Sequence, residues 1–313
     1  MSTELNAAPR TGLDWSRAVR LSPLEFLACW TALRLGDPPL ALDLRPSGTT
    51  LAEHRRLHEA ALAGLAGRGL VDRSGPVVPL AGALRLLATA PYLYDLRLTG
   101  ATGPDNPADW PAELVAVGAA AREHGVVAVL GGGELALLPV PGPRVPPALV
   151  ELIGPLTPAR ARPVNVPAEL LDLACRGVPD GDLWALADRL VEYGVLPADA
   201  NALARMCTGI TAAGQLGATA QLGHTAQLGH NTQPGHTAQL GHTAQAGAPT
   251  QGSNGGQRRG RWVVGFHRGQ AGDCLQLRRP TNTQGVTVTI APITAQKLLT
   301  QLADLLADLD RPG

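Results

Sequence analysis

Near the C-terminus, residues 261–309 constrain the fold of this chain more than any other stretch. Apolar and polar side chains alternate there in three short runs, at residues 262–267, 275–278 and 286–290. A period of two with one apolar face is typical of antiparallel strands that bury one side. Turn residues separate the runs at 269–272 and 280–285, as hairpins require. The stretch therefore predicts three antiparallel strands.

A helix is predicted directly after these strands. Six leucines recur there at the spacing of one helix face, and they are Leu298, Leu299, Leu302, Leu305, Leu306 and Leu309. Burying six leucines stabilises a fold by roughly 9–18 kcal/mol before the loss of chain entropy is subtracted. A block this amphipathic requires a partner surface, so the rest of the chain must supply one.

The charge balance excludes recruitment by bulk electrostatics. The 313 residues include 26 basic and 26 acidic ones, so no net charge attracts nucleic acid or an anionic membrane. No run approaches the ~20 apolar residues that a membrane-spanning helix needs. With 45% hydrophobic residues, the chain has enough apolar side chains for a globular core. We expect neither a nucleic-acid partner nor insertion into a membrane.

The N-terminus and the cysteines favour a cytoplasmic location. The first fifteen residues lack the apolar segment of a signal peptide. Four cysteines are scattered in apolar surroundings, at Cys29, Cys175, Cys207 and Cys274. We interpret them as buried thiols of a protein in a reducing compartment, and not as a disulfide or metal set.

A clear helix start marks the N-terminal region. After a short predicted strand at residues 18–21, Ser22 and Glu25 stand in the order of a capping box, with a proline at the first helical position. Leucines then alternate with other residues over 40–44. This alternation predicts a further short strand.

A second capping box is predicted at Thr50 and Glu53, opening a helix that ends at Gly69. The helix carries His54 and His58 among several arginines. We interpret both histidines as solvated residues of the helix surface, in preference to metal ligands.

Four strands are predicted in the middle of the chain, at residues 92–98, 113–121, 126–130 and 134–140. The connection between the first two, residues 99–111, is longer than the about 2–5 residues of most hairpin loops. Long loops on a rigid sheet often carry recognition. This loop holds one aromatic residue, Trp110, which either contacts a partner or packs back on the sheet.

Three consecutive glycines at residues 131–133 follow one of these strands. A dinucleotide-binding fingerprint requires a third glycine further on and then a helix. Here the chain continues through residues 134–138 directly into Pro139. The glycines therefore predict a hairpin turn.

The order of predicted elements repeats itself. Helices at residues 168–176, 182–193 and 198–207 and a strand from residue 208 mirror the helix-then-strand order of the N-terminal region. We infer two related α+β units, residues 15–140 and 163–313, whose half-sheets join into one domain. Residues 1–14 are expected to be disordered.

A hexapeptide close to Gln-Leu-Gly-His-Thr-Ala begins at Gln215 and recurs through six units, which place His224, His230, His236 and His242 six residues apart. We favour a disordered insertion over residues 215–257 between two strands, because one leucine in six residues cannot offset the entropy of ordering. Two alternatives stay open. One is a parallel β-helix as in many acyltransferases, although six units make only about two coils. The other is a histidine-based metal site, although it lacks Cys or carboxylate partners.

Several phrases occur in a characteristic order. They are Leu-Ser-Pro-Leu-Glu-Phe at 21–26, residues 38–44 followed by 57–70 with Arg-Gly-Leu at its end, residues 119–129, Pro-Val-Asn-Val-Pro-Ala at 163–168, Gly-Gln-Leu-Gly at 214–217, and Ile-Ala-Pro at 290–292. In this order they resemble the EspG family, the cytosolic chaperones of ESX (type VII) secretion systems. The likeness covers residues 15–310 outside the repeat. The chain departs from the family in the repeat itself and in its last hairpin, where the family's Asp-Thr and Gly-Arg phrase is replaced.

The resemblance implies an α+β fold with a central antiparallel sheet, two helical subdomains and an internal pseudo-twofold. It also implies a binding protein with neither enzymatic activity nor a cofactor. Such a chaperone holds the helical tip of a PPE protein, within a PE–PPE heterodimer, soluble in the cytoplasm until export. The client-bound chaperone would be a monomer, and the state of the free protein stays open.

The resemblance also indicates where the client binds. In the family the loop between two central strands and the C-terminal helical bundle make the contact. The loop corresponds to residues 99–111, and its candidate residues are Asp105, Asn106, Asp109 and Trp110. The bundle corresponds to residues 168–207 with 295–309, and its candidate residues are Leu298, Leu302 and Leu305.

Overall fold

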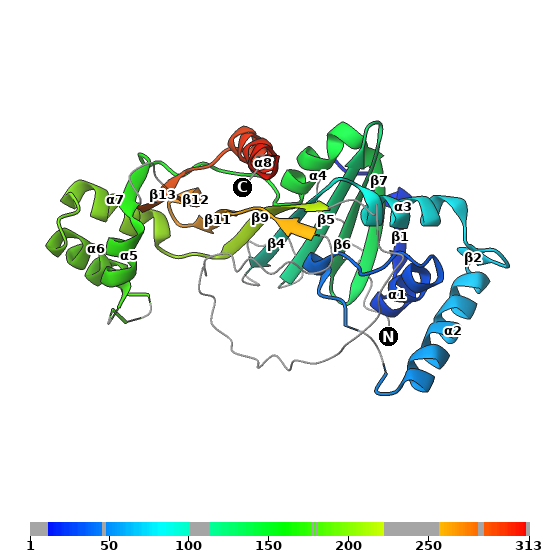
Figure 1. The fold of residues 1–313 in the computed structure, drawn as a ribbon. Coiled ribbons are helices and arrows are strands. Elements are labelled where there is room, and N and C mark those ends of the chain that lie inside the picture. Colours follow the sequence, from blue (N-terminus) through cyan, green and yellow to red (C-terminus); the bar gives the residue numbers. More distant parts are fainter. Residues whose placement is uncertain are drawn as a thin grey trace.

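The protein is described by a computed structural model that covers residues 12–45, 48–100, 113–176, 178–179, 181–221, 257–280 and 285–310. An 11-stranded sheet passes through the middle of this structure, and helices cover both of its faces (Figure 1). The predicted α+β class with a central antiparallel sheet is confirmed.

The strands of the large sheet are β1 (Val19–Leu21), β4 (Tyr92–Gly100), β5 (Glu113–Ala121), β6 (His124–Gly131), β7 (Glu134–Pro141), β8 (Val164–Pro167), β9 (Ala212–Gln221), β10 (Gln257–Arg259), β11 (Val264–Gly269), β12 (Gly272–Pro280) and β13 (Val286–Pro292). Their order is β1-β7-β6-β5-β4-β9-β11-β12-β13-β8, and β10 pairs with β9. Two short strands, β2 (Val71–Asp72) and β3 (Gly75–Pro76), form a separate hairpin.

The helices are α1 (Pro23–Ala32), α2 (Leu51–Gly67), α3 (Val78–Thr89), α4 (Val145–Leu152), α5 (Ala168–Cys175), α6 (Leu183–Glu192), α7 (Pro197–Cys207) and α8 (Ala295–Leu309). Three short 3-10 turns accompany them: η1 (Trp15–Arg17), η2 (Leu40–Leu42) and η3 (Gly142–Arg144).

The two halves of the chain use these elements in the same way. Each half supplies an edge strand, three helices, four longer strands and one closing helix. The sheet order reads alike from both ends when β1 is matched with β8, β7 with β13, β6 with β12, β5 with β11 and β4 with β9. The halves meet where β4 pairs with β9, from Tyr92 opposite Ala220 to Gly100 opposite Ala212. This topology supports the predicted pseudo-twofold.

Helices fill three separate layers around the sheet. The closing helices α4 and α8 lie side by side on one face (Figure 1), over a core that includes Leu96 and Leu216 of the two central strands. On the opposite face, α1 to α3 bury Leu93 and its neighbours of the first half-sheet. Helices α5 to α7 bury Val288 and its neighbours of the second. Each half-sheet is therefore covered on both sides.

The predicted C-terminal strands and helix are present as β11, β12, β13 and α8. The expectation of a single apolar face is wrong. Leu275 and Leu277 face α8, whereas Val288 and Ile290 pack with α5 to α7 on the other face. The register explains the difference, because Ile290 lies opposite Gln276 and not opposite a leucine. The apolar side chains of β12 and those of β13 therefore contact helices on opposite faces of the sheet.

Both predicted helix starts are found, but only the first is a complete capping box. The Glu25 backbone N–H donates to Ser22 Oγ over 3.2 Å, and the Ser22 N–H donates to Glu25 Oε2 over 2.7 Å. At α2 the Glu53 N–H donates to Thr50 Oγ1 over 3.1 Å. The Glu53 carboxylate instead accepts from the N–H of Thr49, one residue earlier. The second box is therefore shifted by one position.

The strand predicted over residues 40–44 is wrong, because Leu40–Leu42 form a 3-10 turn. Pro39 precedes the turn, and Asp43 ends it in the left-handed region with φ 45°, which an extended strand does not adopt. Leu42 is buried while Leu40 is 56% exposed. Of these two leucines, only Leu42 packs in the core, where it holds the turn in place.

The bound predicted for the start of the insertion, Gln215, is wrong, because residues 215–221 belong to a strand. Strand β9 continues through the first repeat unit to Gln221, and its Leu216, Ala218 and Ala220 are buried. This unit pairs antiparallel with β4, which contradicts a parallel β-helix for these residues. The prediction treated this unit as part of a low-complexity repeat, although its residues 216, 218 and 220 alternate as the buried face of a strand does. The remaining units over residues 222–256, with their four histidines, lie outside the described residues.

Candidate protein-binding surface

Helix α6 presents an apolar stripe to solvent. Its inner face is formed by Leu186 and Leu190, which are buried. On the outer face Trp184 is 55% exposed and Val191, two helical turns further on, is 39% exposed. A large aromatic side chain that stays exposed beside a second apolar residue is typical of a surface that binds another protein. We call Trp184 and Val191 the α6 stripe.

Acidic side chains flank the α6 stripe. Asp188 lies between the two apolar residues on the same helix face, and Glu192 follows directly after Val191; both are exposed. The basic residue of this helix, Arg189, is turned toward Tyr193, with Nη2 donating to its hydroxyl over 3.0 Å. The surface therefore matches a partner with apolar side chains and positive charge.

Other exposed apolar residues belong to the same helical subdomain. Leu196 caps α7 and is 66% exposed, and Leu173 of α5 is 39% exposed. A subdomain of short helices buries its few core side chains inward. The remaining apolar residues are left on the surface, where a partner can cover them.

The β4–β5 connection begins at the same end of the sheet as the strand that follows α7. Gly100, the last residue of β4, lies opposite Ala212, the first residue of β9. Helix α7 ends only a few residues before Ala212. On the other side of the connection, Glu113 lies opposite Thr99. The connection is therefore anchored between two central strands, as predicted.

The candidate contact residues of that connection, Asp105, Asn106, Asp109 and Trp110, lie outside the described residues. Whether Trp110 contacts a partner or the sheet therefore stays a prediction.

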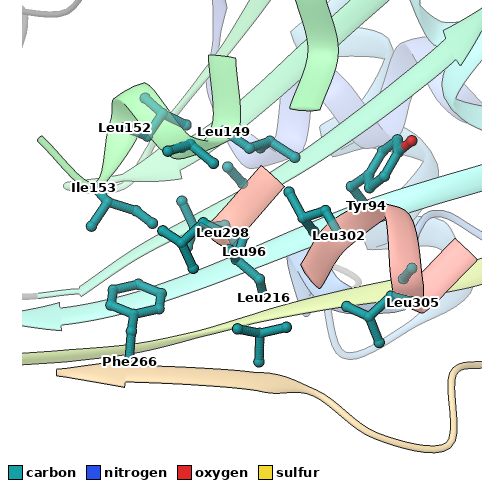
Figure 2. Packing of buried hydrophobic residues seen from close by; sticks show 14 of the residues in the cluster. Tyr94, Leu96, Leu149, Leu152, Ile153, Leu216, Phe266, Leu298, Leu302 and Leu305 are labelled. Carbon is teal, nitrogen blue, oxygen red and sulfur yellow. The ribbon is translucent and has the colours of Figure 1, made fainter. Parts of the chain in front are cut away.

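The three candidate leucines of α8 are core residues. Leu298, Leu302 and Leu305 are 0–1% exposed and pack with Leu96, Leu216 and Phe266 of the sheet (Figure 2). They present no surface to a partner in this structure. The reason is the position of α8, which lies across the central strands and beside α4. The exposed large apolar side chains of the predicted bundle lie on α5 and α6 and at the start of α7, and not on α8.

Sequence reasoning missed Trp184. The helical spacing could have identified it, because residues 186, 187 and 190 are sufficient to form the buried face of α6. Trp184 and Val191 fall outside that face, and a tryptophan that the core does not need is a candidate for binding.

Two buried titratable groups, Asp95 and His267, are paired within the fold. Within those residues, no three His, Cys, Asp or Glu side chains gather closely enough to hold a metal ion. Burial raises the pKa of the Asp95 carboxyl, while Arg259 and Arg97 oppose this effect. An ion pair of 2.9 Å joins Asp95 to Arg259. The buried His267 imidazole lies 2.9 Å from the Met206 carbonyl oxygen. Each of these groups already has a structural partner.

The expectation of four buried cysteines is confirmed for two of them. Cys29 and Cys274 are buried, Cys207 is half-buried, and Cys175 at the end of α5 is exposed. Burial raises the pKa of the Cys29 and Cys207 thiols to about 11 and that of Cys274 to about 12. These three are protonated near neutral pH and are poor nucleophiles.

The histidines of α2 also differ from expectation. His58 is 8% exposed, so the prediction that both rings are solvated is wrong for this residue. Only His58 and Leu65 of α2 are buried, and the helix packs mainly on α1. The prediction relied on the arginines beside His58 in the sequence. It did not consider that His58 lies on the same helix face as Leu65.

The triple glycine forms the predicted turn. Gly131 lies opposite Glu134 in the β6–β7 hairpin. Gly132 and Gly133 have φ values of 59° and 81°, the left-handed conformation that glycine adopts without strain. Strand β7 follows directly, as expected for a hairpin.

The structure is thus an α+β fold whose helix α6 exposes the apolar side chains Trp184 and Val191. The profile of the EspG family matches residues 22–234, more than half of the chain. The chain therefore belongs to the EspG family. A comparison with curated proteins found no match.

A solved structure shows the same fold. It is the Mycobacterium tuberculosis type VII secretion system chaperone EspG5, determined in complex with a PE25–PPE41 dimer. The sequences are 15% identical, the match covers 93% of this chain and 96% of that chain, and the TM-score is 0.63. At this identity the likeness establishes the fold. Within the described residues, no helix has both the length and the apolar character needed to cross a membrane.

Proposed function

We propose that this protein is a cytoplasmic chaperone that binds a PE–PPE heterodimer and keeps it soluble for export by a type VII secretion system. Membership of the EspG family supports the proposal, as does the fold shared with a chaperone solved with such a dimer. The activity is binding, without catalysis and without a cofactor. The exposed α6 stripe is the observation that carries this function.

We assign the client contact to two parts of the chain. One is the α6 stripe with Asp188 and Glu192 beside it. The other is the β4–β5 connection, with Asp105, Asn106, Asp109 and Trp110 as its candidate residues. A helical tip with apolar side chains and a positive charge complements the stripe, because burial of Trp184 contributes affinity and the carboxylates select the basic partner.

Co-expression with the PE–PPE pair of the same genome, followed by size-exclusion chromatography, tests the proposal. The three chains should co-elute as one complex with a single copy of the chaperone. Failure to co-elute with any PE–PPE pair of that genome contradicts the proposal.

A point variant tests the assigned surface. Trp184→Ala should weaken the complex by about 2 kcal/mol or roughly 30-fold in Kd, as expected for a central aromatic contact. Its melting temperature should stay close to that of the original chain, since Trp184 is 55% exposed. Val78→Ala is the matched control, because Val78 is 85% exposed on α3 in the other helical subdomain. Equal affinities for the two variants would show that the client binds elsewhere.

A further inference from the structure

Helix α3 exposes a narrow face that carries a positive charge. Val78 is 85% exposed at the first position of the helix, and Gly82 and Arg85 follow at helical spacing and are exposed as well. Leu80 and Leu84 of the same helix are buried on its other side. A Cβ atom on Gly82 would meet no atom within 4 Å, so the space beside Arg85 is open. We call Val78, Gly82 and Arg85 the α3 stripe.

The α6 stripe has the same spacing and the opposite charge. Trp184, Asp188 and Val191 are separated by four and three residues, as are the members of the α3 stripe. Arg85 is the one charged residue of α3, whereas residues 168–207, which include α6, contain seven acidic and three basic residues. Among the described residues, neither Arg85 nor Asp188 takes part in an ion pair. Each stripe therefore offers apolar surface beside a charge that can pair with a partner.

The two stripes cannot meet within one molecule. Helix α3 covers the first half-sheet and α6 covers the second, and the two helices lie on opposite sides of the central strands (Figure 1). Complementary surfaces that are separated in this way can be joined only between two molecules. A second copy of the chain supplies the matching surface to each stripe.

We propose that, in the absence of client, the α3 stripe of one copy packs on the α6 stripe of a second copy. In an antiparallel arrangement of the two helices, Val78 contacts Val191, and Arg85 lies over the ring of Trp184. An arginine over the face of an indole ring makes a favourable cation–π contact. Burial of the tryptophan against the second copy supplies the apolar part of the affinity.

The charged part of the contact joins Arg85 to Asp188. In the antiparallel arrangement Asp188 lies opposite Gly82, whose missing side chain leaves room for Arg85 to reach the carboxylate. An ion pair between exposed residues contributes little by itself, but like charges at the same place disfavour association strongly. The pair therefore selects the partner helix, while Trp184 contributes most of the affinity.

The contact closes into a dimer. Two copies arranged head to tail around a twofold axis pair α3 with α6 twice. Once the first pair of helices has formed, the second forms within the same complex and adds to its stability. The dimer is reversible, and salt weakens it because the exposed charges are screened.

The dimer covers the α6 stripe, which is also assigned to the client. A client must therefore displace the second copy, and this step rests on the proposed function. The self-association does not rest on it, because it occurs without client. Val78→Ala remains a valid control for client binding when the chaperone is kept below the concentration at which it dimerises.

Sedimentation velocity of the full, untagged chain without client tests the dimer. Over roughly 1–300 μM protein, the sedimentation coefficient should rise from the value of a monomer to that of a dimer. Raising the NaCl concentration from about 0.05 M to about 0.5 M should lower the dimer fraction. A chain that stays monomeric over this concentration range overturns the proposal.

A charge exchange locates the contact. Arg85→Glu and Asp188→Arg should each weaken dimerisation on the order of 10-fold or more, because each variant places like charges together in both contacts. An equimolar mixture of the two variants should dimerise again, since both of its contacts join opposite charges. A mixture that stays monomeric overturns the proposal.

Arg56→Glu is the matched control. Arg56 is an exposed arginine of α2 in the same helical subdomain as α3, and its replacement changes the net charge as much as Arg85→Glu does. This variant should dimerise like the original chain, and an equal loss in both variants overturns the proposal. Circular dichroism confirms that each variant is folded. These measurements contain no client, so their outcome is independent of co-elution with a PE–PPE pair.

Discussion

Gln221 and Gln257 lie opposite each other in the antiparallel pairing of β9 with β10. The residues on either side of 222–256 therefore meet at one point of the sheet. The cross-strand pair is held on the Gln221 side, where Nε2 donates to the Leu87 carbonyl oxygen over 2.9 Å. On the β10 side, Arg259 forms its ion pair with Asp95. Because β9 and β10 already pair at this point, residues 222–256 are not needed to bring the two strands together.

Replacing residues 222–256 by Asn-Gly should leave the protein folded. An Asn-Gly pair closes a two-residue hairpin between strands that are already paired, and loop closure entropy changes slowly with loop length. Thermal unfolding followed by circular dichroism should show one cooperative transition, with a melting temperature no lower than that of the full chain.

A wider excision is the control. Removing residues 215–257 also deletes the part of β9 that contains Leu216, Ala218 and Ala220, all buried in the core with the leucines of α8. That variant should lose its cooperative transition. If both excisions keep, or both lose, the cooperative unfolding transition, then stability does not depend on residues 215–221 while being independent of residues 222–256.

Gly217 should resist replacement because of Asp95. The two residues are opposite each other on β9 and β4, and a Cβ atom on Gly217 would lie 2.7 Å from Asp95 Oδ1. Gly217→Ala should therefore lower the free energy of unfolding by about 1–3 kcal/mol, the usual cost of overpacking a filled site. Urea unfolding measures this change.

Asp95→Ala supplies the partner for a double-variant cycle. With the carboxylate removed, the new methyl group has room, so the double variant should lose less stability than the sum of the single variants. Strict additivity would mean that the close approach to Asp95 is not the reason for the glycine.

Stability should fall as the pH is lowered from 7.5 to 5.5. Burial, and secondly the neighbouring His54, lowers the pKa of His58 below its ordinary 6.5. Burial also lowers the pKa of His267, against the opposing effects of the Met206 carbonyl and Asp273. At these two histidines the folded state therefore binds fewer protons than the unfolded chain near pH 6.5. This contribution to stability is complete above that pH and is lost as the pH falls through and below it.

Urea unfolding at several pH values measures this loss. His58→Gln should flatten the dependence between pH 7.5 and 5.5, because the variant cannot take up a proton there. Leu65→Ala removes the other buried residue of α2 and should cost about 2–5 kcal/mol at every pH without altering the slope. An unchanged slope in His58→Gln would assign the effect to other groups.

Local signals in the sequence determined many elements correctly. Ser22 and Glu25 fix the start of α1 through bonds between residues three apart. The glycines at 131–133 fix a hairpin, and the alternating residues of β12 fix a strand. Such features depend on a few neighbouring residues, so they can be read without knowing the rest of the fold.

The tertiary structure decided which side chains are covered. Leu302 became core and Trp184 stayed exposed, although both belong to short amphipathic helices. His58 became buried, and the first repeat unit, from Gln215 to Ala220, became part of a central strand. Composition and periodicity show that a face is apolar, but burial requires a second surface at the right place. That surface comes from the pairing of β4 with β9 and from the helices laid across them, which are contacts between residues far apart in the chain.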